Sequence, residues 1–118
     1  MKILVSDPLS NVGIEIFENT PGFDVDVKTD LSPTELEDII GVYDGLSIRS
    51  KTKVDDNLLA KARNLKVIGR AGIGLDNVDI PTATRADIAV MNTPFGNAIT
   101  TAEHTIAMMM ALSRNIPK

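Results

Sequence analysis

Short apolar runs rich in β-branched residues alternate along this chain with segments that carry helix-start signals. The sequence predicts strands at five of these runs: 2–5, 23–27, 45–48, 66–68 and 88–91. Strands that alternate with helical segments at this spacing are typical of a parallel sheet with helices on both faces. Because crossovers between parallel strands are right-handed, we expect an α/β domain with a flavodoxin-like, five-stranded sheet.

The segments between the strands begin with residues that stabilise helix N-termini. Ser32, Pro33 and Glu35 predict a capping box, in which the Ser32 and Glu35 side chains bond reciprocally to backbone N–H groups. Thr100 and Glu103 have the same spacing, so the last helix is expected to begin there. N-cap residues are also expected at three other positions: Ser10, Asp55 and Asp79.

The last helical segment differs from the others because its apolar residues cover the whole circumference. Residues 106–112 read IAMMMAL, whereas a helix that covers one face of a sheet needs a single apolar stripe. We expect burial on more than one side, by a second domain, a partner subunit or both; a central core helix is the alternative. The sequence therefore divides into a domain over 1–98 and an interdomain or dimerisation helix over 99–118, where the chain is expected to be truncated.

The composition excludes several kinds of protein. The 118 residues suit a single domain, and the net charge of −4 is spread along the chain without a basic cluster, so no nucleic-acid partner is expected. No window has the length of a membrane span or the pattern of a signal peptide, so we expect a cytoplasmic protein without a membrane partner. With no cysteine and His104 as the single histidine, thiolate and two-imidazole metal sites are excluded.

The glycine-rich stretch 69–79 raises the question of a dinucleotide site. The dinucleotide fingerprint needs a third glycine where this chain has Asn77, and an acidic residue about 20 positions further on. Residues 91–93 are Met, Asn and Thr, and no Gly-Lys-Ser/Thr follows the glycines to make a Walker-type loop. The stretch is therefore not expected to hold the phosphates of a dinucleotide.

Polar groups follow several strands, at the edge where parallel strands end together. Residues 6–8, 49–50, 70–74 and 92–97 are expected at this edge, where open parallel sheets bind ligands. Guanidinium groups and the backbone amides of successive glycines bind carboxylates and phosphates. This predicts a site for a small dianion or a phosphorylated acid without an obvious general base. An ordinary glycine turn beside a solvated arginine is the alternative.

Four segments resemble D-2-hydroxyacid dehydrogenases, in order and at the spacing of that family: SIRSKTKV at 47–54, VIGRAGIGLDNVD at 67–79, VMNTPFGN at 90–97 and AEHTIAMMMALSRNIP at 102–117. The resemblance implies an NAD-dependent oxidoreductase acting on CH–OH groups. This chain would be its substrate-binding domain, followed by the helix that leads toward a missing Rossmann NAD domain. The family's catalytic residues and its true dinucleotide loop would follow residue 118, so no catalytic residue is expected here and the chain alone should be inactive.

The resemblance also implies which residues bind the substrate: Arg49, Ser50, Arg70, Gly72, Ile73, Gly74 and Asn97. The arginines and the serine would bind the phosphate or hydroxyl end of a small phosphorylated hydroxy acid. The amides of the glycine loop would hold the carboxylate, Asn97 would orient the substrate, and Ile73 would also approach the nicotinamide of NAD. The missing domain would bind most of the NAD, and the helix over 99–118 would make a homo-oligomer. Glu103 and His104 are expected to be structural.

Two other classes and other members of the family are alternatives. A receiver domain has nearly this length and fold, but it needs an acidic phosphoacceptor after the third strand and a lysine after the fifth. Arg49-Ser50 and Asn92-Thr93 stand at these positions, so this class is disfavoured. A stand-alone anion-binding or dimerisation module is the second alternative. Within the family, dehydrogenases of glycerate, glyoxylate and lactate share much of the scaffold.

Overall fold

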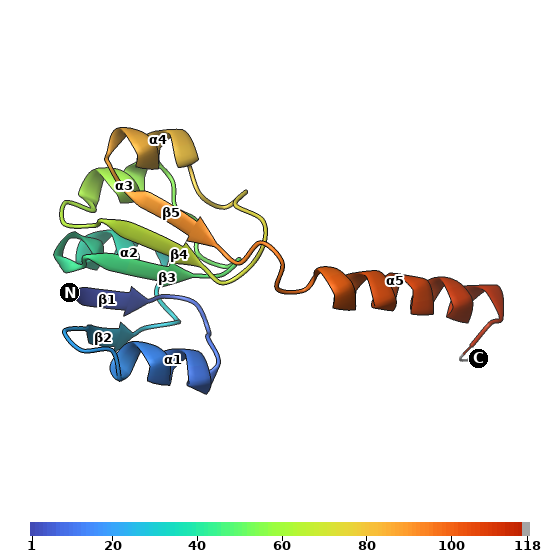
Figure 1. Ribbon diagram of the computed structural model, residues 1–118. Coiled ribbons are helices and arrows are strands. Elements are labelled where there is room, and N and C mark those ends of the chain that lie inside the picture. The colour runs from blue at the N-terminus through green and yellow to red at the C-terminus, as the bar shows by residue number, and fades with distance from the viewer. Residues whose placement is uncertain (117–118) are drawn as a thin grey trace.

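A single five-stranded parallel sheet forms the centre of the molecule (Figure 1). The computed structural model describes residues 1–116. The strands are β1 (Lys2–Val5), β2 (Asp24–Val27), β3 (Gly45–Ile48), β4 (Val67–Arg70) and β5 (Ala89–Asn92). Their spatial order, β2-β1-β3-β4-β5, is the flavodoxin-like order. The predicted fold class and all five strands are confirmed.

The limits of three strands differ from the prediction by one or two residues. β2, β4 and β5 each begin one residue later than expected, and β4 continues through Gly69 and Arg70. These two residues pair with Ser47 and Ile48 of β3. Backbone ladder bonds need no apolar side chain, so the strand continues after the hydrophobic pattern has ended. Arg70 therefore lies in the sheet and not in the loop that follows it.

The short helices begin where their capping residues predict. They are α1 (Asn11–Glu18), α2 (Pro33–Ile39), the 3₁₀ turn η1 (Ile40–Val42), α3 (Asp56–Lys61) and α4 (Ile80–Arg85). Ser10, Ser32, Asp55 and Asp79 each accept a hydrogen bond from a backbone N–H of the first turn, and Ser32 and Glu35 make the full capping box. Helix starts in this chain are therefore determined by local chemistry.

The predicted start of the last helix is wrong. The helix α5 (Ala98–Ser113) begins two residues before Thr100, with Asn97 at the N-cap and no side-chain capping bond. The Thr100 hydroxyl donates instead to the carbonyl oxygen of Asn97, at 3.1 Å. Because this hydroxyl bonds back along the helix, it is not available to cap it.

The hydrophobic core lies between the sheet and the helices α2, α3 and α4. Leu4, Leu46 and Ile68 from the strands are at most 2% exposed and pack with buried residues such as Leu36 and Leu58 from the helices. Side chains alternate between the faces of a strand, so Ser47, Gly69 and Met91 belong to the opposite face, which α1 borders. Helices therefore lie on both faces, as predicted, but α1 contributes no buried residue.

The helix α5 projects away from the sheet (Figure 1), and none of its residues is buried. The alternative of a central core helix is therefore wrong. The exposed apolar side chains of α5 are Ile99, Ile106, Met108, Met109, Met110 and Leu112. What covers them stays a prediction, and residues 117–118 of the expected 99–118 segment lie outside the described part of the chain. Among the described residues, no helix is long and apolar enough to cross a membrane.

Candidate functional site

A cavity of about 460 Å³ opens at the carboxyl ends of the strands, and we call it the edge cavity. Four loops line it: the β1–α1 loop, the loop after β3, the loop after β4 and the β5–α5 connection. Its lining residues are Leu9, Ser10, Arg49, Ala71, Gly72, Ile73, Thr93, Gly96 and Asn97. The cavity lies where parallel open sheets bind their ligands, because the strands all end on this side.

The edge cavity brings together four of the seven predicted site residues. Arg49, Gly72, Ile73 and Asn97 line it, although they come from three separate loops. The side chain of Arg49 is exposed and therefore free to contact a ligand, and Ile73 is 40% exposed. This grouping is the geometric requirement for one small anion to contact a guanidinium and the glycine loop together.

The other three predicted residues, Ser50, Arg70 and Gly74, do not line the edge cavity. Ser50 and Gly74 lie in exposed loops. Arg70 lines an adjacent apolar groove, which shares Leu9, Ala71 and Thr93 with the edge cavity. Arg49 and Arg70 therefore line two neighbouring spaces that share a wall.

Arg70 is placed by two contacts. Its Nε donates to Oδ1 of Asn77 at 3.1 Å, and its guanidinium lies so close to Gly72 that a Cβ there would clash with Nη1 and lie 2.9 Å from Cζ. Glycine is required at position 72 because it lets the guanidinium approach this closely. Its backbone conformation does not require glycine, since Gly72 is not among the residues with a left-handed φ. Through Gly72, the guanidinium of Arg70 borders the wall of the edge cavity.

The glycine loop is only partly available as an anion-binding nest. The amide of Gly72 donates to the carbonyl of Arg70 at 2.9 Å. Among the described residues, the backbone amides of Ile73 and Gly74 donate no hydrogen bond. Asn92 holds the loop by donating through Nδ2 to the carbonyl of Ile73 at 2.7 Å. The amides of residues 73 and 74 are therefore the ones that can bind a carboxylate.

The loop does not have the geometry of a dinucleotide cradle. That cradle needs a helix N-terminus directly after the glycines, because the helix amides bind the pyrophosphate. Here α4 begins only at Ile80, and its first turn is capped by Asp79. The sequence-based exclusion agrees with this geometry, and the pyrophosphate of NAD does not fit these residues.

Asn77 has a function that the sequence did not reveal. In the sequence it stands out only as the residue that replaces the third glycine of the fingerprint. In the structure its Nδ2 donates to the carbonyls of Arg49 at 2.8 Å and Thr52 at 2.7 Å, while its Oδ1 accepts from Arg70. One side chain thus connects the loop after β3 to the arginine of β4.

Asp7 is a second residue that the sequence placed at the edge without a role. It is 1% exposed, and its carboxylate accepts from the amide of Arg49 at 2.6 Å. The Thr52 amide and hydroxyl also donate to it, at 3.1 Å and 2.7 Å. Burial by itself raises the pKa of Asp7, but these donors outweigh burial and hold the pKa below its ordinary value. Asp7 therefore carries a full negative charge at neutral pH.

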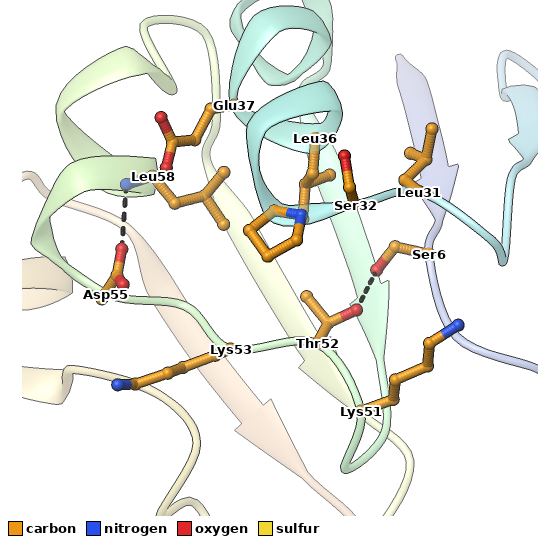
Figure 2. A pocket seen from close by; sticks show the side chains of 11 residues that line it. Ser6, Leu31, Ser32, Leu36, Glu37, Lys51, Thr52, Lys53, Asp55 and Leu58 are labelled. Atoms are coloured by element: carbon orange, nitrogen blue, oxygen red, sulfur yellow. Dashed lines mark hydrogen bonds between the residues drawn. The ribbon is translucent and has the colours of Figure 1, made fainter.

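A smaller cavity of about 210 Å³ lies on the opposite side of the loop after β3, between the N-termini of α2 and α3 (Figure 2). Leu31, Leu36 and Leu58 give it apolar walls, and Ser6 and Thr52 give it two hydroxyl groups. The two hydroxyl oxygens are 3.0 Å apart. The loop that carries Arg49 thus separates two cavities.

No group of three or more His, Cys, Asp or Glu side chains within residues 1–116 could hold a metal ion. Glu103 and His104 are exposed on α5 and do not line the edge cavity.

Comparison with known proteins identifies the family. The family profile described as D-isomer specific 2-hydroxyacid dehydrogenase, catalytic domain, matches residues 3–115. The chain belongs to this family. The resemblance predicted from the four sequence segments is thereby confirmed.

Relatives with an assigned activity match nearly the whole chain. The D-3-phosphoglycerate dehydrogenase of Synechocystis is 52% identical over 98% of this chain, and that of Archaeoglobus fulgidus is 48% identical over 100% of this chain. The chain covers only 21% and 22% of these two proteins, so it spans about a fifth of their length.

Solved structures support the same family and fold. A protein of Thermus thermophilus superposes with a TM-score of 0.89 at 28% identity, over 98% of this chain and 38% of that one. The 3-phosphoglycerate dehydrogenase of Entamoeba histolytica, solved with bound NAD⁺, superposes with a TM-score of 0.80 at 33% identity, over 94% of this chain and 38% of that one.

Proposed function

We propose that this chain is the substrate-binding part of an NAD-dependent D-3-phosphoglycerate dehydrogenase, which oxidises 3-phosphoglycerate to 3-phosphohydroxypyruvate in serine biosynthesis. The relatives named above carry that activity in their names. The observation that carries the proposal is the edge cavity, where Arg49, the glycine loop and Asn97 meet. These groups suit a small acid with two anionic ends.

In this proposal each end of the substrate has its own partners. The guanidinium of Arg49 binds the phosphate, and the guanidinium of Arg70, which lies against Gly72, adds a second positive charge. The amides of Ile73 and Gly74 bind the carboxylate, because both lack a partner among the described residues. Ser50 donates to the phosphate or hydroxyl end. Asn97 orients the substrate from the cavity wall.

The cofactor is held mainly outside this chain. NAD supplies the two-electron acceptor for the oxidised carbon when it is bound. The residues of this chain do not fit its pyrophosphate, because α4 begins too far from the glycines, but the exposed side chain of Ile73 suits an apolar contact with the nicotinamide ring. The acid–base residues of the reaction belong, in this proposal, to parts of the protein outside these 118 residues.

The proposal extends to assembly and location. A homo-oligomer through the segment 99–118 would cover the apolar side chains that α5 exposes, among them Ile106 and Met109. A biosynthetic dehydrogenase of this kind is expected in the cytoplasm.

The test uses the full-length protein that contains this chain. We expect NAD-dependent turnover of 3-phosphoglycerate with a kcat/KM at least about a hundredfold above that for glycerate or lactate, since charged hydrogen bonds to the phosphate are lost with the latter. NADP measured in parallel tests the choice of cofactor. Equal kcat/KM for phosphorylated and unphosphorylated acids would overturn the substrate assignment in favour of another 2-hydroxyacid dehydrogenase.

Arg49→Ala tests the site itself. We expect the KM for 3-phosphoglycerate to rise roughly tenfold to hundredfold, with a smaller effect on glycerate, because the lost contact is specific to the phosphate. Arg85→Ala is the matched control, since Arg85 is an exposed arginine at the end of α4 that does not line the edge cavity. An unchanged KM in Arg49→Ala would contradict the proposed site.

A further inference from the structure

We propose that Asp7 and Thr52 are positioning residues that hold Arg49 in place for the substrate. Neither lines the edge cavity, so their effect on the substrate would pass through the backbone of the loop after β3. The inference rests on the proposed function for the identity of the substrate, while the support of Arg49 is read directly from the geometry.

The loop after β3 wraps around the carboxylate of Asp7. Asp7 follows β1, which pairs directly with β3, so the two loops leave the sheet side by side. The amide of Arg49 donates to Oδ2 at 2.6 Å, and the amide of Thr52 donates to both oxygens at 3.1 Å. The Thr52 hydroxyl donates to Oδ1 at 2.7 Å. The buried carboxylate of Asp7 thus accepts hydrogen bonds from both ends of the four-residue turn 49–52.

The direction of each hydroxyl proton follows from the charge on Asp7. An ionised carboxylate only accepts, so the single proton of the Thr52 hydroxyl points to Asp7. At the 3.0 Å contact between the hydroxyls, drawn in Figure 2, Ser6 is then the donor and Thr52 the acceptor, in preference to the longer 3.4 Å bond from Ser6 to the carbonyl of Ser47. The resulting chain of donors, from Ser6 to Thr52 to Asp7, fixes the side chain of Thr52 from both sides.

The backbone of Arg49 is held on its other side by Asn77, whose Nδ2 donates to the Arg49 carbonyl at 2.8 Å and to the Thr52 carbonyl at 2.7 Å. The peptide groups on both sides of Arg49 are therefore fixed, whereas its side chain is exposed and unsupported. The position of the guanidinium depends on where this backbone lies. A displacement of about 1 Å in such a group is enough to weaken its contact with the substrate substantially.

The test compares isosteric changes at Thr52 in the full-length protein. Thr52→Val keeps the shape and the amide but removes the hydroxyl donor, and Thr52→Ser keeps the donor. We expect Thr52→Val to raise the KM for 3-phosphoglycerate about fivefold to tenfold with kcat changed less than about twofold, and Thr52→Ser to restore the wild-type KM. Asp7→Asn should raise the KM more strongly, because the NH₂ group of the asparagine is a donor and would face the amides and the hydroxyl that donate to Asp7 in the wild type.

Asp44→Asn is the matched control for a purely structural effect. Asp44 also accepts from a backbone amide, that of Lys2 at 2.8 Å, and from a side chain, that of Lys66 at 2.8 Å, but it precedes β3 and lies at the opposite edge of the sheet. It should lower the denaturation midpoint and leave the KM unchanged. A KM in Thr52→Val within twofold of wild type, or an equal rise in KM in Asp44→Asn, would overturn the proposal.

A second readout keeps the inference separate from the proposed function. Hydrogen exchange of the backbone amides over residues 49–52 should be at least about tenfold faster in Thr52→Val than in the wild type or in Thr52→Ser, because the amides of Arg49 and Thr52 lose a fixed acceptor. If the protein does not oxidise 3-phosphoglycerate but this exchange increases, the proposed function fails and the support of Arg49 stands. If the exchange is unchanged, the support itself is refuted.

Discussion

Gly72→Ala tests how closely Arg70 and the glycine loop act together. A Cβ at Gly72 would clash with Nη1 of Arg70 and lie 2.9 Å from its Cζ, where ordinary contact begins near 3.4 Å. The guanidinium must therefore move away, and the 3.1 Å hydrogen bond from its Nε to Asn77 is lost. The backbone of Gly72 needs no left-handed φ, so alanine adds no backbone strain.

The expected change in stability is small. Losing one partly buried hydrogen bond from a charged donor costs about 1 kcal/mol, and the lower entropy of the unfolded chain with alanine returns about 0.4–1 kcal/mol. The free energy of unfolding of Gly72→Ala, measured by urea denaturation, should thus stay within about 1 kcal/mol of the wild type. Gly69→Ala is the control for an added methyl in β4, the strand that precedes this loop, since nothing lies within 4 Å of its Cβ position.

The expected change in substrate binding is large. Displacing a guanidinium that binds an anion removes roughly 1.5–3 kcal/mol, or about tenfold to hundredfold in the KM of the full-length protein. A double-mutant cycle with Arg70→Ala separates this from simple crowding of the cavity: in the Arg70→Ala background, Gly72→Ala should have little further effect. An undiminished effect in that background, or an unchanged KM in Gly72→Ala alone, would refute the reasoning.

Three further predictions concern the core, the pH response and the projecting helix. The hydroxyl of Tyr43 donates to Asp26 at 2.7 Å, and the Tyr43 side chain is only 2% exposed. Tyr43→Phe removes this donor and should lower the free energy of unfolding, measured by urea denaturation, by about 1 kcal/mol. An unchanged free energy of unfolding would contradict the hydrogen bond. Because the pKa of Asp7 is lower in the folded protein than in the unfolded chain, Asp7 of the unfolded chain binds a proton first as the pH falls. The stability that Asp7 contributes is therefore present at neutral pH and is lost progressively below about pH 5. Asp7→Asn should flatten this fall in acid urea titrations, and an equally steep fall would refute it. Met109→Lys places a charge on the exposed apolar surface of α5 and should shift the full-length protein toward smaller oligomers in analytical ultracentrifugation. Thr105→Lys, which changes a polar position on the same helix, should shift it less. Equal shifts in the two variants would contradict an apolar interface.

The helix starts and the family could be predicted from the sequence because both depend on residues that lie close together in the chain. Ser32 and Glu35 cap α2 through bonds that span three residues, and the same holds for Asp79 at α4. The exception, Thr100, has the right spacing but bonds back to Asn97. A capping signal predicts where a helix can begin, while competing local bonds decide which of two nearby positions is used.

The site residues were predicted because they follow the strands directly. This prediction depends only on the parallel topology, in which all strands end at the same edge of the sheet. The edge cavity indeed gathers Arg49, Gly72 and Asn97 from distant positions in the chain. The sequence could not tell that Arg70 continues β4, because strand limits follow backbone pairing across the sheet.

By itself, the sequence determined the α/β class, the order of elements, the caps of the first four α-helices and the family, since periodicity, capping and motif spacing act over a few residues. Only the tertiary structure decided that Asp7 and Asn77 hold the loop of Arg49, and that α5 extends beyond the sheet with its apolar side chains exposed. Those features depend on contacts between residues more than 25 positions apart, or on surfaces that this chain does not itself cover. Their geometry arises only when the strands are placed side by side.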